Sequence, residues 1–135
     1  MIRRALEEDF NRLKELDSLL EPEELVFKIQ TGRILVYELE GEIIGWLRYN
    51  MFWDQIPFMN LLFIQEEYRG RGFGIELMNY WETEMMALGH LMAMTSSRTD
   101  EDAQHFYRKF DYQDSGSLVL PGESMEIIFL KNLIR

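Results

Sequence analysis

The residues best suited to chemistry form a short loop, Arg69-Gly70-Arg71-Gly72-Phe73-Gly74. It follows the apolar run Phe58–Ile64 and precedes a segment with helical periodicity. Glycine tolerates positive φ and close backbone approach, so the N–H groups of such a loop can converge on an anion. A helix start adds unpaired N–H donors and partial positive charge, and the two arginines add cations. The segment therefore predicts a site for a phosphate or a diphosphate.

The spacing separates this loop from two common phosphate loops. A P-loop ends in Lys followed by Ser or Thr, and this loop has neither. Its glycines are spaced Gly70-x-Gly72-x-Gly74, whereas dinucleotide-binding folds use Gly-x-Gly-x-x-Gly. The alternative interpretation is a strand-to-helix turn that needs glycine only for tightness, with solvated arginines.

The composition narrows the classes of protein further. With 24 Asp+Glu against 14 Lys+Arg, the net charge is −10, which is the wrong sign for general nucleic-acid binding. The absence of Cys excludes a thiolate nucleophile, and two His cannot form a three-histidine zinc site, although carboxylates could still assist one. We expect no metal. The N-terminal segment lacks the apolar core of a secretory signal, and the longest mostly apolar stretch, Pro57–Ile64, is too short to span a membrane. We therefore predict a cytoplasmic protein without a membrane partner.

The length of 135 residues and the 47% hydrophobic content predict one domain over residues 1–135. The first half of the chain is expected to contain a short strand at Met1–Leu6, a helix Glu7–Leu20, a hairpin of Arg33–Leu39 and Glu42–Asn50, and a strand Phe58–Ile64 buried on both faces. The second half is expected to contain a helix from the loop to about Leu88, a strand Leu91–Thr95, a helix Asp100–Phe110, and closing strands Leu118–Leu120 and Met125–Lys131. The first helix carries an apolar stripe of Phe10, Leu13, Leu16 and Leu20. The order β-α-β-β-β-α-β-α-β-β predicts an α/β fold with a mixed sheet.

Two segments match motifs of one superfamily. Arg69-x-x-Gly72-x-Gly74 fits the pattern Arg/Gln-x-x-Gly-x-Gly/Ala, and residues 67–74 resemble the acetyl-CoA loop of the GNAT N-acetyltransferases. Residues 100–112, DEDAQHFYRKFDY, resemble the Asn-x-x-Ala-x-x-Phe-Tyr-x-Lys-x-Gly-Phe/Tyr segment of that family. The order of elements also agrees, so the resemblance covers essentially the whole chain.

The resemblance implies a mostly antiparallel sheet flanked by helices and an N-acetyltransferase that uses acetyl-CoA as cosubstrate. It implies that the acetyl-pantetheine arm meets the main chain of Leu62, Phe63 and Ile64, and that Arg69 to Gly74 hold the diphosphate. Two residues depart from the family pattern. Asp100 replaces an Asn that bonds the pantetheine arm, and a carboxylate accepts a hydrogen bond but cannot donate one. Asp111 replaces a Gly, which predicts a turn with some strain.

Direct acetyl transfer needs a neutral amine, an oxyanion stabiliser and a proton for the departing thiolate. By resemblance, Tyr107 faces the CoA sulfur and is the candidate proton donor. The alternative is that Tyr107 only packs on the buried side of its helix. No general base is identified: Asn60 falls where some family members have Glu, and an amide could only position a water. Asp54 and Glu66 are weaker candidates for the base.

The resemblance implies that the acceptor pocket is built by the first helix, the loop after it and the hairpin tips, segments that here carry acids and an aromatic residue. Glu24, Trp53, Asp54 and Asn60 are the candidate substrate residues, since acids and a Trp ring suit a cationic amine. A solvated acidic face is the alternative. A small amine, a polyamine, an aminoglycoside and a protein lysine or N-terminus all stay open as acceptors. An acyl-CoA-binding regulatory module without turnover is the alternative function, a Met-rich protein-interaction domain is less favoured, and a homodimer is common in the family.

Overall fold

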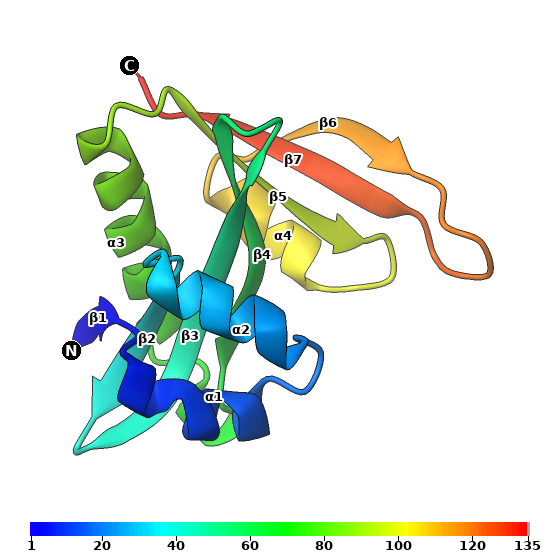
Figure 1. Ribbon diagram of the computed structural model, residues 1–135. Helices are drawn as coiled ribbons and strands as arrows, with labels where there is room; N and C mark the ends of the chain where they lie inside the picture. The colour runs from blue at the N-terminus through cyan, green and yellow to red at the C-terminus, as the bar shows by residue number, and fades with distance from the viewer. Residues whose placement is uncertain (135) are drawn as a thin grey trace. The chain divides into compact units, whose positions relative to one another are not determined.

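The computed structural model describes residues 1–134, and its elements follow the predicted order with one addition (Figure 1). The strands are β1 (Ile2–Arg4), β2 (Ile34–Leu39), β3 (Glu42–Phe52), β4 (Ile56–Ile64), β5 (Met92–Arg98), β6 (Gln113–Leu118) and β7 (Glu126–Asn132). The α-helices are α1 (Phe10–Leu16), α2 (Pro22–Gln30), α3 (Phe73–Ala87) and α4 (Ala103–Lys109), with short 3₁₀ turns η1 (Glu7–Asp9) and η2 (Glu66–Tyr68). Among these residues, no helix combines the length and the apolar character needed to cross a bilayer.

The strands form one hydrogen-bonded order, β1-β2-β3-β4-β5-β7-β6. The pairs β1–β2, β2–β3, β5–β7 and β6–β7 are antiparallel. In contrast, β4 and β5 are parallel, with Phe58 opposite Met94 and Met59 opposite Thr95. This arrangement confirms the predicted α/β class and the mixed, mostly antiparallel sheet.

The chain divides into two compact units. Unit 1 contains Met1–Tyr49 and Leu61–Trp81, and unit 2 contains Asn50–Asn60 and the chain from Glu82 onward. The strands β3 and β4 and the helix α3 each contribute residues to both units. The expectation of one domain over residues 1–135 stays a prediction, and the two units are described separately below.

Unit 1 has an apolar core between its helices and β2–β3. The fully packed members are Ala5, Leu13, Leu25, Ile34, Val36, Ile43 and Trp46, and the flanking members are Phe10, Leu16, Leu20, Ile29 and Leu61. The stripe predicted on the first helix therefore faces this core, as period-3.6 spacing requires.

The first helix is shorter than predicted, and the helix α2 was not predicted at all. The α1 helix ends at Leu16 because Asp17 turns its buried carboxylate toward β3, where it accepts bonds from Trp46 Nε1 at 3.1 Å and Arg48 Nε at 2.7 Å. Pro22 then opens α2 at its first turn, a position that needs no N–H donor. The buried residues of α2 are Leu25 and the charged Lys28, so only one of them is apolar.

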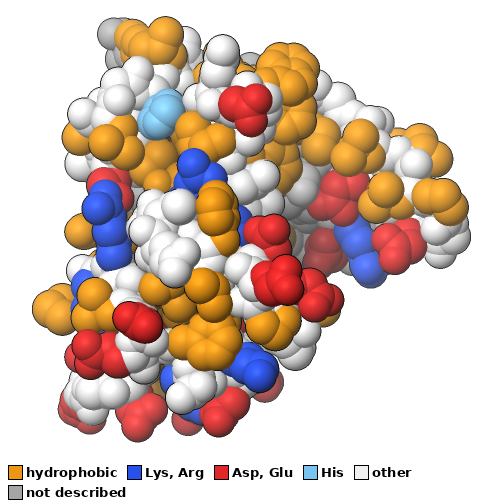
Figure 2. Space-filling model, viewed as in Figure 1, with side chains coloured by type: hydrophobic (Ala, Val, Ile, Leu, Met, Phe, Trp, Pro, Cys, Tyr) orange, Lys and Arg blue, Asp and Glu red, His pale blue; other side chains and the backbone are white. Residues whose placement is uncertain are grey.

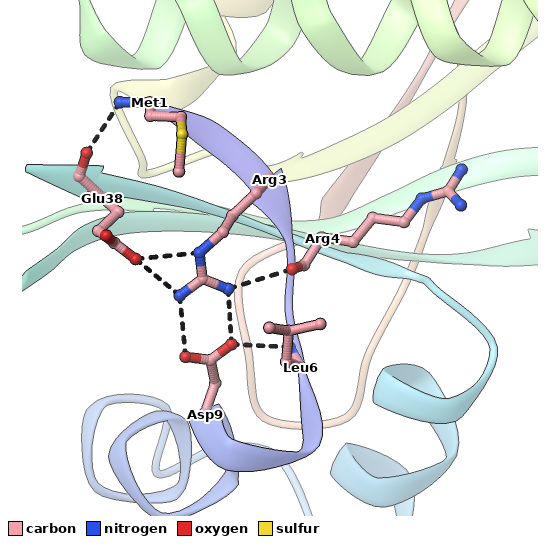
Figure 3. Close-up of polar contacts among 6 residues, drawn as sticks. All are labelled: Met1, Arg3, Arg4, Leu6, Asp9 and Glu38. Atoms are coloured by element: carbon pink, nitrogen blue, oxygen red, sulfur yellow. Dashed lines mark hydrogen bonds and ion pairs between the residues drawn. The ribbon is translucent and has the colours of Figure 1, made fainter. Parts of the chain in front are cut away.

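The first strand is held by the Arg3 guanidinium (Figure 3). Arg3 bonds both carboxylate oxygens of Asp9, at 2.7 and 3.0 Å, and also bonds Glu38 at 2.8 Å. The same Asp9 accepts the backbone N–H of Leu6 at 2.7 Å. The bond from Arg3 is the main reason why the pKa of Asp9 lies below its usual value. These contacts join β1, η1 and β2 within unit 1.

The structure corrects two predictions about strands. Phe58–Ile64 was expected to be buried on both faces, but of these residues only Met59 is buried, and Asn60 and Phe63 are exposed. The last antiparallel pair was expected to begin near Leu118, but β6 starts at Gln113 and is exposed throughout. Its polar residues are held by backbone pairing with β7 rather than by an apolar side-chain pattern, which hid the strand from sequence analysis.

Candidate functional site

The end of β4 is fixed by a close approach of β3 in unit 1. Gln65 donates its backbone N–H to the Ile44 carbonyl at 2.8 Å and its side-chain Nε2 to the Ile43 carbonyl at 2.6 Å. A Cβ placed on Gly45 would lie 2.9 Å from the Phe63 carbonyl oxygen and 2.5 Å from Ile64 Cδ1. Glycine at position 45 therefore allows the main chain of Phe63–Ile64, which the sequence analysis assigned to the cofactor, to lie where it does.

The loop after β4 has the backbone geometry that the glycines predicted. Gly70 has φ +76° and Gly72 has φ +87°, values that a side chain strongly disfavours. A Cβ at either position would meet no atom within 4 Å, so both residues face open space. Phe73 then begins α3, where the first N–H groups of a helix lack internal partners. At Gly74 an added Cβ would lie 3.8 Å from Ile64 Cγ1, so this glycine lies where the helix packs on the strand end.

The two arginines of the loop differ in their contacts. Arg69 donates its Nε to the Ile64 carbonyl at 2.7 Å, and its guanidinium carbon lies 4.9 Å from the centre of the Phe63 ring. Arg71 is exposed and lies 5.7 Å from the ring of Tyr68. Arg69 thus ties the loop back to β4 through its Nε, whereas Arg71 extends from the exposed part of the loop.

The start of α3 has a partner that the sequence analysis missed. Tyr37, on β2, donates its hydroxyl to Glu76 Oε2 in the first turn of the helix. Its ring also meets the Phe73 ring edge-on, with the centroids 4.8 Å apart. The hydrogen bond to Glu76, followed by burial, raises the pKa of Tyr37. No local motif could indicate this contact, because the two residues are 39 positions apart in the chain.

Tyr107, the predicted proton donor, lies on α4 in unit 2. The residue is 6% exposed, and its ring centre lies 5.9 Å from that of Phe129 and 6.2 Å from that of Tyr112. Burial, partly offset by a hydrogen bond with Thr95, raises the pKa of Tyr107 to about 12. Thr95 itself donates to the Met59 carbonyl at 3.0 Å, at the parallel pairing of β4 and β5. The phenol therefore remains protonated at neutral pH.

The two departures from the family pattern are both visible in unit 2. Asp100 is exposed and already paired: it accepts bonds from the Arg98 guanidinium at 3.1 and 3.2 Å and from the Ser124 hydroxyl at 2.8 Å. These bonds lower the pKa of Asp100. Asp111 has φ +71°, which confirms the predicted turn with a non-glycine residue in the left-handed region.

The candidate acceptor residues lie on different elements. Trp53 and Asp54 form the turn before β4, with φ +54° and +62°, and the Gln55 N–H closes it on the Phe52 carbonyl at 3.1 Å. Trp53 is 76% exposed, and its ring centre lies 4.7 Å from that of Phe52. This turn directly precedes β4, whereas the glycine loop comes after the end of the same strand. Glu24 is exposed on the first turn of α2 rather than in a loop after the first helix.

The two remaining candidates are both at the surface. Asn60 is exposed on β4, and Glu66 is exposed in η2. Acidic side chains are spread over the face shown in Figure 2, in keeping with the net charge of −10. Within residues 1–134, no three His, Cys, Asp or Glu side chains are grouped as ligands for a metal ion.

A comparison with known protein families identifies the family of this chain. The profile of the Acetyltransferase (GNAT) family matches residues 2–112. The chain belongs to the GNAT acetyltransferase family. No curated protein matches the sequence significantly.

Solved structures show the same fold at low sequence identity. Ard1 from Thermoplasma volcanium has a TM-score of 0.86 at 19% identity, over 100% of this chain and 98% of that one. A GNAT family acetyltransferase from Bacillus cereus has a TM-score of 0.78 at 22% identity, with coverage of 100% and 98%. Naa50 from Arabidopsis thaliana, in complex with the bisubstrate analogue CoA-Ac-MVNAL, has a TM-score of 0.79 at 17% identity, with coverage of 98% and 97%.

Proposed function

We propose that the protein transfers an acetyl group from acetyl-CoA directly to a primary amine. The observation that carries this proposal is the loop at residues 69–74, in which Gly70 and Gly72 hold positive φ beside open space immediately before α3. Such a loop and helix start bind a diphosphate through backbone N–H groups. Membership of the GNAT family makes coenzyme A the expected diphosphate ligand.

In this proposal the cofactor runs along the end of β4. The main chain of Leu62, Phe63 and Ile64 pairs with the acetyl-pantetheine arm, as an added strand would. Gly70 to Gly74 receive the diphosphate, and Arg71 adds a cation beside it. Arg69 contributes mainly by holding the loop to the Ile64 carbonyl. Asp100 is already bonded to Arg98 and Ser124, so a contact of its carboxylate with the pantetheine arm would compete with those bonds.

The proposed acetyl transfer involves three groups that change charge: the acceptor amine, the carbonyl oxygen and the departing thiolate. The acceptor amine, with an ordinary pKa near ~10.4, loses a proton before its nitrogen attacks the thioester carbonyl. Backbone N–H groups near Phe63–Ile64 stabilise the tetrahedral oxyanion. When the C–S bond breaks, the thiolate takes a proton, and Tyr107 is the proposed donor. A phenol with a pKa of about 12 is a weak acid but is fully protonated at neutral pH.

The proposed acceptor is a primary amine on a peptide or a small molecule. Two structural neighbours point to peptide amines: one is described as a ribosomal-protein-alanine N-acetyltransferase from Brucella melitensis, and Naa50 is bound to a CoA–peptide analogue. The acidic side chains, including Glu24 on α2 and Asp54 before β4, favour a cationic acceptor. A water positioned by Asn60 is the proposed route for the amine proton.

Thiol release is a direct assay here, because the protein contains no Cys that would react with a thiol reagent. Acetyl-CoA is incubated with the protein and a panel of amines that includes peptides with free N-termini, polyamines and aminoglycosides. The proposal predicts release above the blank for at least one amine and CoA binding in a calorimetric titration. Binding without release across the panel would favour the regulatory module, and the absence of both would contradict the proposed function.

The cofactor site is tested by reversing one charge of the loop. Arg71→Glu should weaken CoA binding by about tenfold or more, because a cation beside the diphosphate becomes an anion. Arg12→Glu is the matched control: it makes the same change of net charge at another exposed arginine of unit 1, on α1. Equal affinity of the two variants would place the diphosphate elsewhere.

A further inference from the structure

One side chain of β2 connects the two segments assigned to the cofactor in unit 1. Tyr37 pairs with Gly45 across the β2–β3 ladder, and Gly45 is the residue against which the Phe63 carbonyl and Ile64 pack. On its other side, Tyr37 contacts Phe73 and bonds Glu76, in the turn that directly follows the glycine loop. A single 8% exposed side chain therefore lies between the strand end and the helix start.

The hydrogen-bond partner of Tyr37 carries a negative charge close to the proposed diphosphate site. Glu76 is a carboxylate in the first turn of α3, the end of the helix at which an anion would bind. An unheld carboxylate at this position could move toward the loop and repel a diphosphate. The Tyr37 hydroxyl instead holds Glu76 Oε2 on the side of β2, and the bond to a charged acceptor is a strong one.

We propose that Tyr37 is a positioning residue for the diphosphate of coenzyme A, acting through Glu76. It holds the first turn of α3 against β2, so that the helix start and the loop Arg69–Gly74 keep one arrangement toward the ligand. This inference rests on the proposed function. It assigns to Tyr37 no contact with the ligand itself.

The test compares the binding of CoA with the binding of a ligand that lacks the diphosphate. Dissociation constants of CoA and of pantetheine, which lacks the diphosphate and the nucleotide, are measured by NMR titration of the wild type and of Tyr37→Phe. The variant keeps the ring against Phe73 and loses only the hydroxyl. We expect the dissociation constant for CoA to rise about threefold to tenfold, less than the full effect of a hydrogen bond to a charged group because the lost bond acts on the ligand only through Glu76, and that for pantetheine to stay unchanged.

Two variants of the partner sharpen the result. Glu76→Gln keeps an acceptor oxygen for Tyr37 and removes the negative charge, so it should bind CoA at least as tightly as the wild type. Glu76→Ala removes the acceptor together with its charge, so it should weaken CoA binding no more than Tyr37→Phe does, and the double variant should be no weaker than Tyr37→Phe alone. This non-additivity distinguishes a shared bond from two independent effects.

Three results would overturn the inference. They are an unchanged CoA affinity in Tyr37→Phe, an equal loss of affinity for CoA and pantetheine, and strict additivity in the double variant. Failure of the wild type to bind CoA would instead contradict the proposed function and the inference together, so the two failures are distinguishable.

Discussion

Two regions of the molecule carry the candidate functional residues, and each uses a different kind of group. In unit 1, the loop at residues 69–74 is exposed and offers backbone N–H groups, and its glycines at positions 70 and 72 have positive φ. In unit 2, Tyr107 is buried among Phe129 and Tyr112, and its hydroxyl is the proposed functional group. The proposed role of the loop depends on backbone conformation, and that of Tyr107 on one side chain. If both proposals hold, substitutions in the loop should affect binding, and substitution of Tyr107 should affect turnover.

The largest effect is expected at Tyr107. Tyr107→Phe removes the phenol and keeps the ring, so kcat should fall about 100-fold, at the lower end of what general acid catalysis contributes, with little change in the affinity for acetyl-CoA. The measurement is thiol release at saturating substrate, with an amine identified in the panel. Unchanged turnover would leave Tyr107 with a packing role alone.

A neighbouring tyrosine provides the control for Tyr107. Tyr112 is also buried in unit 2, and its hydroxyl donates to Glu82 at 2.8 Å, while Glu82 accepts a second bond from Lys131 at 2.7 Å. Tyr112→Phe should lower the free energy of unfolding by roughly 1–3 kcal/mol, because a buried carboxylate loses a donor, and should leave kcat nearly unchanged. A similar fall in kcat in both variants would indicate a general loss of packing rather than loss of a proton donor.

A smaller effect, on binding, is expected at Gly72. Gly72→Ala places a Cβ at φ +87°, which costs about 1 kcal/mol or more, or pushes the loop into another conformation. We expect CoA affinity to fall about tenfold and kcat to change little. Gly41→Ala is the matched control, because Gly41 also lies in unit 1, has φ +81° and faces open space, in the β2–β3 turn. If both variants bind CoA equally, the conformation of Gly72 does not support the ligand.

The smallest effect compares an ion pair from each unit. Arg3–Asp9 is partly buried, with side chains 24% and 12% exposed, whereas Arg98–Asp100 is exposed at 46% and 51%. Asp9→Asn should therefore destabilise the protein by roughly 1–2 kcal/mol, and Asp100→Asn should destabilise it less. Chemical denaturation at pH 7 measures both changes.

The Asp9 pair also predicts a pH dependence. The pKa of Asp9 is lowered on folding, so its contribution is fully present above the unfolded pKa of about 3.9 and is lost as the pH falls through the lower folded value. The difference between wild type and Asp9→Asn should thus be constant near neutral pH and shrink below about pH 4. A difference that persists unchanged at lower pH would show that the pair does not act through the charge of Asp9.

Sequence analysis predicted the parts of this protein that depend on local chemistry. Glycines at positions 70 and 72 predicted positive φ, because this conformation is set by local backbone sterics. The turn at Asp111 was predicted from the family pattern, which has a Gly at that position. The mixed sheet, the hairpin of β2 and β3 and the family followed from short-range periodicity and from motif spacing. The polar strand β6 was missed because it has no apolar repeat of its own, and α2 was missed because its acidic first turn was interpreted as part of a loop after the first helix.

The tertiary structure alone decided what depends on residues far apart in the chain. Asp17 ends α1 because Trp46 and Arg48 draw its carboxylate to β3, and Gly45 is required only because the end of β4 packs on it. The bond from Tyr37 to Glu76 likewise exists only once β2 and α3 are packed together. The sequence by itself therefore determined the backbone conformation of the glycine loop, through local sterics, and the family of the chain, through its motifs. The structure decided which distant side chains hold that loop, because such contacts form only when burial brings separate elements together.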